Sequence, residues 1–422
     1  MFEHILNKIK PSKDEEINLL NKVNSFCKIL QELGLEIMIG GSVGKGTWLK
    51  GTSDVDIYVL YKDDKNISDK LESKLKQTNL SYIRVQGSRD YFKVFFEDLE
   101  FELIPILKID SPEKARNVTD LSPFHVKYVK SKIKENKFLA DEIRLTKAFF
   151  KSIGVYGAES YINGFSGYVC EVITIYYKSF MNLVKDAVKW RPKVVIDVEN
   201  FYPDKSKIFE EINKDKLKSP IIVIDPVYKE RNIASAVNCK SFSKLIFYCR
   251  RLLENLSSPD EYFITKKKNL DYAMNKKSKM GTKLLYISLK GRSNNKDVAN
   301  TKILKFSEML CKVLSVLGFV VLDVDLKFQD SLEDKAELFV YYYPESLPKY
   351  EKKLGPPVWV YNNAEKFYNK WRNYEVKFDN SGRIIILAPR RIYNISEAIE
   401  FFFNKYKDSI NNKVEILQIS YF

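Results

Sequence analysis

Histidine and paired cysteine are scarce in this chain. Its 422 residues include only two histidines, His4 and His125. Zinc sites draw most of their ligands from histidine and cysteine, so the composition argues against a histidine-based metal centre. The five cysteines are odd in number and form no Cys-x-x-Cys pair: Cys27, Cys170, Cys239, Cys249 and Cys311. Their scatter argues against a disulfide framework and favours a reducing compartment.

Long apolar runs are missing as well. The N-terminus is charged from Glu3 onward and has no apolar core of a signal peptide. The longest candidate for a membrane span, residues 168–177, is interrupted by Glu171 and is shorter than the roughly 20 residues a spanning helix needs. We therefore predict a soluble, cytoplasmic protein without a membrane partner.

Acidic residues are outnumbered by basic ones. Seventy lysines and arginines against 55 acids give a formal charge of +15, which favours a polyanionic partner through counterion release. Residues 264–283 carry many lysines against a single acid, Asp271, and aromatic side chains are interleaved with them, as on RNA-binding surfaces. The predicted RNA-binding cations are Lys266, Lys267, Lys268, Lys276 and Lys277.

Two acids alternate at the start of a predicted strand, residues 55–61. Because side chains alternate along a strand, Asp54 and Asp56 point to the same face. Two neighbouring carboxylates repel each other and lose solvation, so a chain rarely places them so without a cation between them. The pair therefore predicts a site for a hard metal ion.

A glycine-rich turn and a basic loop precede these acids, in the order GGSVGKGTWLKGTS over residues 40–53. Glycine lets the backbone approach a ligand closely, and backbone N–H groups with the Ser42 hydroxyl and the Lys45 ammonium suit a polyphosphate. Gly41, Ser42 and Lys45 are therefore predicted to bind nucleotide. A Walker A loop is excluded, because only three residues separate Gly40 from Gly44 and a glycine stands where serine or threonine is required.

A third carboxylate is expected from the predicted strand at residues 99–107, where Glu100 and Glu102 share one face. If this strand lies beside residues 55–61, one of these acids joins Asp54 and Asp56. Glu102 is the predicted ligand, and Glu100 is the alternative. A second Asp-x-Asp pair, Asp323 and Asp325, has no glycine turn before it and is interpreted as an exposed strand face.

The periodicity of the chain changes twice, which predicts a multidomain α+β protein. Residues 1–110 are predicted as a mixed sheet with packed helices, and residues 111–259 as mainly helical, with one long buried helix over residues 167–188. Residues 260–422 alternate between strands and helices, as α+β RNA-binding folds do.

The motif at residues 40–56 resembles that of the DNA polymerase β-like nucleotidyltransferase superfamily, and more narrowly that of the archaeal class I CCA-adding enzymes (tRNA nucleotidyltransferases). Further segments along nearly the whole chain are similar to motifs of that family. They are Ser122-Pro-Phe-His125, Asp141-Glu-Ile-Arg-Leu-Thr-Lys147, Gly154-Val-Tyr156-Gly-Ala-Glu159, Gly164-Phe-Ser-Gly-Tyr-Val-Cys-Glu171, Asp225-Pro-Val with Arg231-Asn232, and Leu354-Gly-Pro-Pro-Val-Trp359.

The resemblance implies a catalytic head (residues 1–110), a helical neck that binds nucleotide (111–259), and an RNA-binding body and tail (260–422). It implies template-independent addition of C, C and A to the 3′ end of tRNA from CTP and ATP, with release of pyrophosphate. Asp54, Asp56 and Glu102 would hold two Mg²⁺ ions. Four residues would join the nucleotide site: His125, Lys147, Tyr156 and Arg231.

The resemblance also implies that the last third clamps the acceptor stem and the TΨC arm of the tRNA. The oligomeric state is left open, with a homodimer among the options. Two positions depart from the family pattern, which usually has aspartate at Glu102 and often glutamate at Asp54.

Two other interpretations remain. A poly(A) polymerase or a 2′-5′ oligoadenylate synthetase would share the head but select ATP alone. A non-enzymatic RNA-binding protein with a decayed head disagrees with the intact glycines and acids.

Overall fold

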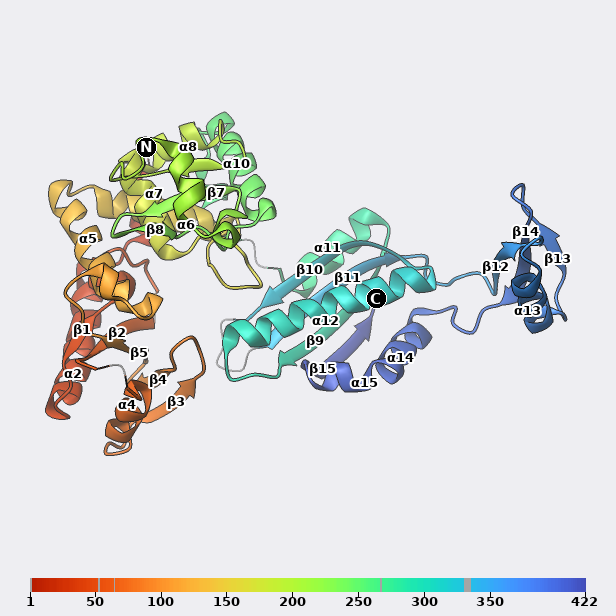
Figure 1. Cartoon of the computed structure of the whole chain (residues 1–422), viewed down its shortest axis with the longest axis horizontal. Coiled ribbons are helices and arrows are strands. Elements are labelled where there is room, and N and C mark those ends of the chain that lie inside the picture. Colours follow the sequence, from red (N-terminus) through yellow and green to blue (C-terminus); the bar gives the residue numbers. More distant parts are fainter. Residues whose placement is uncertain (1, 52–53, 64, 266–267, 330–334) are drawn as a thin grey trace. The chain divides into compact units, whose positions relative to one another are not determined.

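The computed structural model describes residues 2–51, 54–63, 65–265, 268–329 and 335–422. The chain divides into two compact units, Met1–Lys266 and Lys267–Phe422, and each is described by itself (Figure 1). The predicted α+β class is confirmed in both units. The predicted boundary near residue 110 falls inside the first unit, and the division into three domains stays a prediction.

A mixed five-stranded sheet forms the start of the first unit. Its order is β1-β2-β5-β4-β3, and β2 and β5 are parallel whereas the other neighbours are antiparallel. The strands are β1 (Ile37–Ile39), β2 (Asp54–Tyr61), β3 (Ser81–Val85), β4 (Tyr91–Phe96) and β5 (Leu99–Leu107). Helices α2 (Lys13–Glu32) and α4 (Ile67–Leu75) pack their apolar stripes on this sheet, and Phe26 stacks on Phe101 with ring centroids 4.0 Å apart.

Helix α2 begins where its sequence indicates. The Ser12 hydroxyl accepts from the Glu15 N–H and the Glu15 carboxylate accepts from the Ser12 N–H, which completes the capping box. The glycine turn that follows β1 differs from its prediction as a loop, because residues 41–45 form a short helix, α3 (Gly41–Lys45), that ends at left-handed Gly46.

The rest of the first unit is mainly helical around a second apolar core that includes Phe149, Phe165 and Phe180. Its helices are α1 (Glu3–Ile9), α5 (Ser122–Glu135), α6 (Leu139–Ser152), α7 (Gly167–Tyr177), α8 (Phe180–Ala187), α9 (Ile208–Glu211) and α10 (Cys239–Glu254). A small sheet of order β6-β7-β8 accompanies them: β6 (Val194–Ile196), β7 (Ile221–Asp225) and β8 (Tyr228–Asn232). Short 3₁₀ helices lie at Pro112–Lys114, Val118–Leu121, Lys205–Lys207, Lys214–Leu217 and Pro259–Tyr262.

The prediction of one long helix over residues 167–188 is wrong. Lys178 has a left-handed backbone (φ 62°), which ends α7, and the Ser179 hydroxyl then caps α8 by accepting from the Asn182 N–H. Apolar periodicity continues across both helices, so it concealed the break.

The second unit contains an antiparallel sheet of order β10-β11-β9-β15 with helices on both faces (Figure 1). Its strands are β9 (Lys283–Gly291), β10 (Val320–Phe328), β11 (Lys335–Tyr343) and β15 (Val414–Tyr421). Leu285 on β9 packs against α12 (Lys296–Leu317) and α14 (Ile395–Lys405), which α15 (Lys407–Asn411) follows. The adjacent Leu284 points to the opposite face, where α11 (Leu270–Met280) packs.

A smaller sheet of order β12-β14-β13 belongs to the same unit: β12 (Tyr350–Pro357), β13 (Val376–Phe378) and β14 (Arg383–Pro389), with helix α13 (Tyr361–Trp371). The strands β12, β13 and β15 and the helices α11, α13 and α15 were not anticipated from the sequence. Within the described ranges, no helix is both long and apolar enough to cross a membrane.

Candidate active site

The acids of two distant segments meet on neighbouring parallel strands. Strand β2 pairs with β5 so that Asp54 lies opposite Glu100 and Asp56 lies opposite Glu102. The predicted neighbourhood of these two strands is therefore confirmed. Because side chains on paired positions share a face, all four carboxylates lie on the same side of the sheet.

The two glutamates differ in their surroundings. Glu100 forms an ion pair with Lys93 of β4, whereas Glu102 lies 3.5 Å from the same ammonium group and directly beside Asp56. Burial raises the pKa of Glu102 to about 7, and the charge of Asp56 adds to this effect. Burial also raises the pKa of Asp56, with a further contribution from Asp54. Glu102 is therefore the better placed third acid.

This donor set fits a hard divalent cation. In the described part of the chain, no three carboxylate, imidazole or thiol groups are gathered closely enough to hold a metal ion by themselves. The acids nevertheless offer only carboxylate oxygens, which Mg²⁺ and similar ions prefer. Burial, and to a lesser extent the neighbouring carboxylates, raise the pKa values of Asp56 and Glu102, and a bound cation would oppose both effects.

The glycine turn lies directly against these acids. Gly41 has φ +54°, and a Cβ built on it would lie 1.6 Å from Asp56 Oδ2. The Gly40 N–H donates to the Asp56 carbonyl oxygen at 2.7 Å, and a Cβ on Gly40 would lie 2.5 Å from the Tyr58 ring. Ser42 follows on α3 and is half-buried. Only glycine permits this contact between the turn and β2.

Two predicted phosphate-binding lysines meet at one carboxylate. Lys45 Nζ lies 2.8 Å from Glu171 Oε2, and Lys147 Nζ lies 2.7 Å from Glu171 Oε1. The Thr47 hydroxyl donates to Glu171 Oε1 at 2.7 Å and accepts from Lys147 at 2.9 Å. The Lys45 side chain is 9% exposed, whereas those of Lys147 and Glu171 are 3% and 1% exposed.

The ionisation of this cluster follows from its charges. Burial alone would raise the pKa of Glu171, but the ammonium groups of Lys147 and Lys45 outweigh burial and lower its pKa to about 2. Burial lowers the pKa of Lys147, which Glu171 opposes. Glu171 is therefore an ionised carboxylate in the interior, held by two cations.

Side chains of helix α6 form hydrogen bonds with the loop that follows α3. The Arg144 guanidinium donates to the Trp48 carbonyl oxygen at 3.0 Å, to the Gly46 carbonyl oxygen at 2.8 Å and to Asp141 at 2.6 Å. Arg144 and Lys147, one helical turn apart, thus bind the same loop.

A second cluster, centred on the buried Asp225, contains His125 and Arg231. Both donate to Asp225, at 3.0 Å and 3.1 Å, and Tyr168 donates to the same carboxylate at 3.2 Å. The His125 and Tyr168 rings stack with centroids 4.0 Å apart, and the Lys45 ammonium lies 4.9 Å from the Tyr168 ring centroid. Burial lowers the pKa of His125 although Asp225 opposes this. The cluster therefore adjoins the Lys45 side chain.

Tyr156 lies near the lysines as well. It precedes α7 in a bridge with Phe165, and a Cβ built on Gly167 would lie 2.8 Å from the Tyr156 hydroxyl and 3.9 Å from Lys147 Cε. The structure thus brings Tyr156 and Lys147 together around Gly167.

The predicted RNA-binding lysines are in differing environments. Lys266 and Lys267 lie outside the described residues. Lys268 is 2.6 Å from Asp325, and Lys276 is 2.5 Å from Asp323 and 2.6 Å from Asp325. The interpretation of both aspartates as an exposed strand face is wrong for Asp325, whose side chain is 6% exposed, because α11 covers it. Lys277, on α11, is half-buried.

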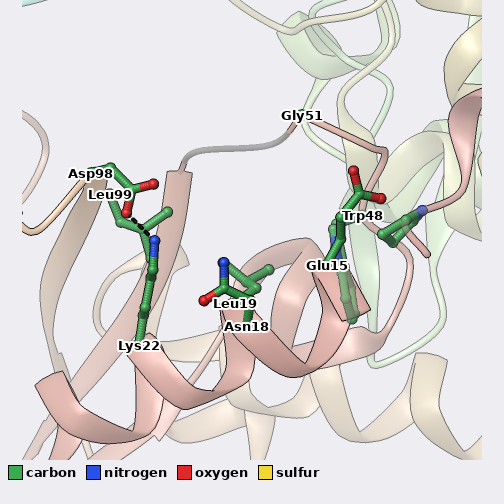
Figure 2. A pocket seen from close by; sticks show the side chains of 9 residues that line it. Glu15, Asn18, Leu19, Lys22, Trp48, Gly51, Asp98 and Leu99 are labelled. Carbon is green, nitrogen blue, oxygen red and sulfur yellow. Dashed lines mark hydrogen bonds and ion pairs between the residues drawn. The ribbon is translucent and has the colours of Figure 1, made fainter. Parts of the chain in front are cut away.

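The described part of the chain also has a hollow beside α2, lined by Asn18, Leu19, Trp48 and Leu99 among others (Figure 2). An ion pair between Lys22 and Asp98 lies at one side of it. None of the predicted site residues lines this hollow.

Three family models together match most of the chain. Residues 20–143 match the nucleotidyltransferase domain, residues 141–264 the second domain of tRNA nucleotidyltransferase, and residues 280–418 the C-terminal domain of the CCA-adding enzyme. A CCA-adding enzyme from Nanoarchaeum equitans is 38% identical over 414 residues, which span 96% of this chain and 98% of that protein. The chain belongs to the CCA-adding enzyme family. The predicted membership and enzyme class, tRNA nucleotidyltransferase, are thereby confirmed.

Other members of the CCA-adding enzyme family agree. The proteins from Methanocaldococcus jannaschii and Sulfurisphaera tokodaii are 30% and 32% identical, over 99% and 94% of this chain and 92% and 90% of theirs. Nucleotidyltransferases of this superfamily generally use divalent metal ions.

Solved structures show the fold of this CCA-adding family member. A cytoplasmic RNA terminal U-transferase and the Cid1 poly(U) polymerase both align with a TM-score of 0.50, at 16% and 15% identity. They cover 63% and 62% of this chain and 97% of their own. At this identity the likeness extends to the nucleotidyltransferase fold alone.

The sequence contained a signal for one functional residue that was not singled out. Glu171 was noted as an interruption of an apolar segment and as the last residue of a family-like segment, without a role of its own. A single acid within a buried helix requires a cationic partner, so its position could have indicated the pairing with Lys45 and Lys147. Thr47 gave no comparable signal, because its contacts depend on tertiary structure.

Proposed function

We propose that this protein adds C, C and A to the 3′ end of tRNA from CTP and ATP, without a nucleic-acid template. The observation that carries the proposal is the register of β2 and β5, which places Glu102 beside Asp56, the acid that lies against the Gly41 turn. Family membership supports the choice of reaction.

Asp54, Asp56 and Glu102 would hold Mg²⁺. When bound, two such ions would make the 3′ hydroxyl more acidic and would neutralise charge on the departing pyrophosphate. The residues of the chain orient the reactants: the turn at Gly41 and Ser42 approaches the triphosphate by its backbone, and the 3′ oxygen attacks the α-phosphorus as pyrophosphate leaves.

The cations around the turn bind the rest of the nucleotide in this proposal. Lys45 meets the triphosphate, Lys147 and Tyr156 support it from α6 and the start of α7, and His125 and Arg231 flank the base. The shared contacts of His125 and Arg231 with Asp225 support this assignment, because they fix both side chains in one orientation.

The proposal extends to the domains and the RNA. Residues 1–110 form the catalytic head, residues 111–259 the neck, and residues 260–422 the body and tail. The body and tail bind the acceptor stem and TΨC arm through a basic surface on α11. A homodimer is the oligomeric state to test, by light scattering at several protein concentrations.

The deciding experiment incubates the protein and Mg²⁺ with a tRNA that lacks its last three nucleotides. CTP alone should add two C residues, and a terminal A should appear only when ATP is present with CTP. Long A tracts from ATP alone would instead support the poly(A) polymerase alternative. Absence of incorporation on any RNA would contradict the proposal.

A further inference from the structure

The role of Glu171 is not explained by the glycine motif at residues 40–53 or by the proposed metal-binding acids. Its two oxygens each take one lysine of the predicted triphosphate site, Lys45 at 2.8 Å and Lys147 at 2.7 Å. The carboxylate is buried, and Thr47 completes its hydrogen bonds. The single carboxylate group of Glu171 thus pairs with both lysines, one through each oxygen.

This arrangement imitates the way a phosphate group would be bound. A phosphate also presents oxygens on one centre to ammonium groups and backbone donors. Lys147 donates to Glu171 and Thr47 and is almost fully buried, whereas Lys45 retains some exposure. Any polyphosphate that approaches these lysines meets ammonium groups already shared with Glu171.

We propose that Glu171 is an internal counter-anion of the triphosphate subsite, with which the polyphosphate of the nucleotide competes for Lys45 and Lys147. This inference rests on the proposed function. Glu171 is a positioning residue here, because it acts on the substrate through the two lysines. It weakens polyphosphate binding and thereby speeds the release of pyrophosphate after each addition.

A purely structural Glu171 predicts a different behaviour. If the carboxylate served only to hold α7 to the loop after α3, then its neutralisation would loosen the lysines and weaken every ligand. If it competes with phosphate, then neutralisation leaves two cations without their anion, and polyphosphate binds more tightly.

The test compares Glu171→Gln with the wild-type chain by calorimetric titration of inorganic tripolyphosphate in the absence of divalent ions. We expect at least about tenfold tighter binding, because removing one unit charge a few ångströms away changes affinity by one to two powers of ten. Glu72→Gln, which carries the same change of net charge at the Arg84 ion pair, should leave the affinity unchanged.

Steady-state kinetics supply the second measurement. For Glu171→Gln we expect a lower KM for CTP together with a lower kcat, since pyrophosphate leaves more slowly. Tripolyphosphate binding that is unchanged or weaker in folded Glu171→Gln would overturn the inference. If that variant does not fold, Glu171→Asp decides. Its shorter side chain reaches the lysines poorly, so binding about threefold tighter supports the inference and unchanged binding overturns it.

Failure of this inference is distinguishable from failure of the proposed function. A wild-type chain that adds CCA to tRNA, with no difference in tripolyphosphate binding between variants, would overturn the counter-anion alone. A wild-type chain that adds no nucleotide, with the difference in binding present, would overturn the proposed reaction and leave the counter-anion supported.

Discussion

A single methyl group at Gly41 should remove most of the activity. A Cβ there would lie 1.6 Å from Asp56 Oδ2, and real Cβ contacts essentially never fall below 3.0 Å. The carboxylate or the turn must therefore move by about 1.4 Å, the difference of these two distances. A displacement of about 1 Å at a catalytic group costs roughly a hundredfold in rate.

We therefore expect Gly41→Ala to lower kcat/KM for nucleotide incorporation by about 10²- to 10³-fold, which corresponds to about 3–4 kcal/mol of activation free energy. The left-handed backbone of Gly41 adds about 1–2 kcal/mol of strain to the folded state. For a unit of this size, such strain lowers Tm by only a few degrees. Activity should thus fall far more than stability.

Gly34→Ala is the matched control. Gly34 follows α2 with φ +75°, and a Cβ there would have no atom within 4 Å. This variant carries the same backbone strain without the contact, so it should lose a similar amount of Tm and retain its activity. Incorporation by Gly41→Ala within about threefold of the wild type would refute the reasoning, as would an equal loss in Gly34→Ala.

Three other predictions concern the acids, the buried pair and the lysines. Asp56→Ala should reduce incorporation of both CTP and ATP below about one hundredth while tRNA binding stays unchanged in a filter assay; more residual turnover would argue against a metal ligand. The pKa of Glu171 is lowered to about 2 in the folded chain, so Glu171 holds its proton more tightly in the unfolded chain than in the folded one. Its stabilisation is therefore complete above the ordinary pKa of 4.5 and disappears as pH falls through about 2. The difference in Tm between the wild type and Glu171→Gln should shrink from pH 6 to pH 3, and a constant difference would contradict the pairing. Lys276→Ala should lower the free energy of unfolding by about 1–3 kcal/mol, since Asp325 loses a buried partner. Lys277→Ala should instead preserve stability and reduce the salt slope of tRNA binding by about one; the reverse pattern would place the RNA elsewhere.

Local patterns in the sequence predicted the parts of the site that depend on few residues. Strand alternation put Asp54 and Asp56 on one face, and the capping box at Ser12 fixed the start of α2. Glu102 could be predicted only on the condition that two strands, separated by α4, β3 and β4, are neighbours. That condition is a property of the sheet, and no pattern within either strand encodes it.

Other features required the folded chain. The break at Lys178 depends on one residue in a left-handed conformation, which the surrounding apolar periodicity hides. Lys147 reads as an ordinary helix lysine, yet its ammonium group is buried against Glu171. Asp325 reads as a surface acid, yet α11 covers it. In each case the deciding contact comes from a distant segment.

Each half of the site already contains internal ion pairs. Lys93 lies beside the acids of β5, and Glu171 pairs with the two lysines that we propose to meet the triphosphate. In the proposed function, binding of a nucleotide with its divalent ion would exchange these ion pairs, and each internal partner would give way to an external one. Such an exchange releases few counterions, so nucleotide affinity should vary little with ionic strength. The site can then keep a steady affinity for nucleotide while the affinity for the RNA changes with the salt of its surroundings.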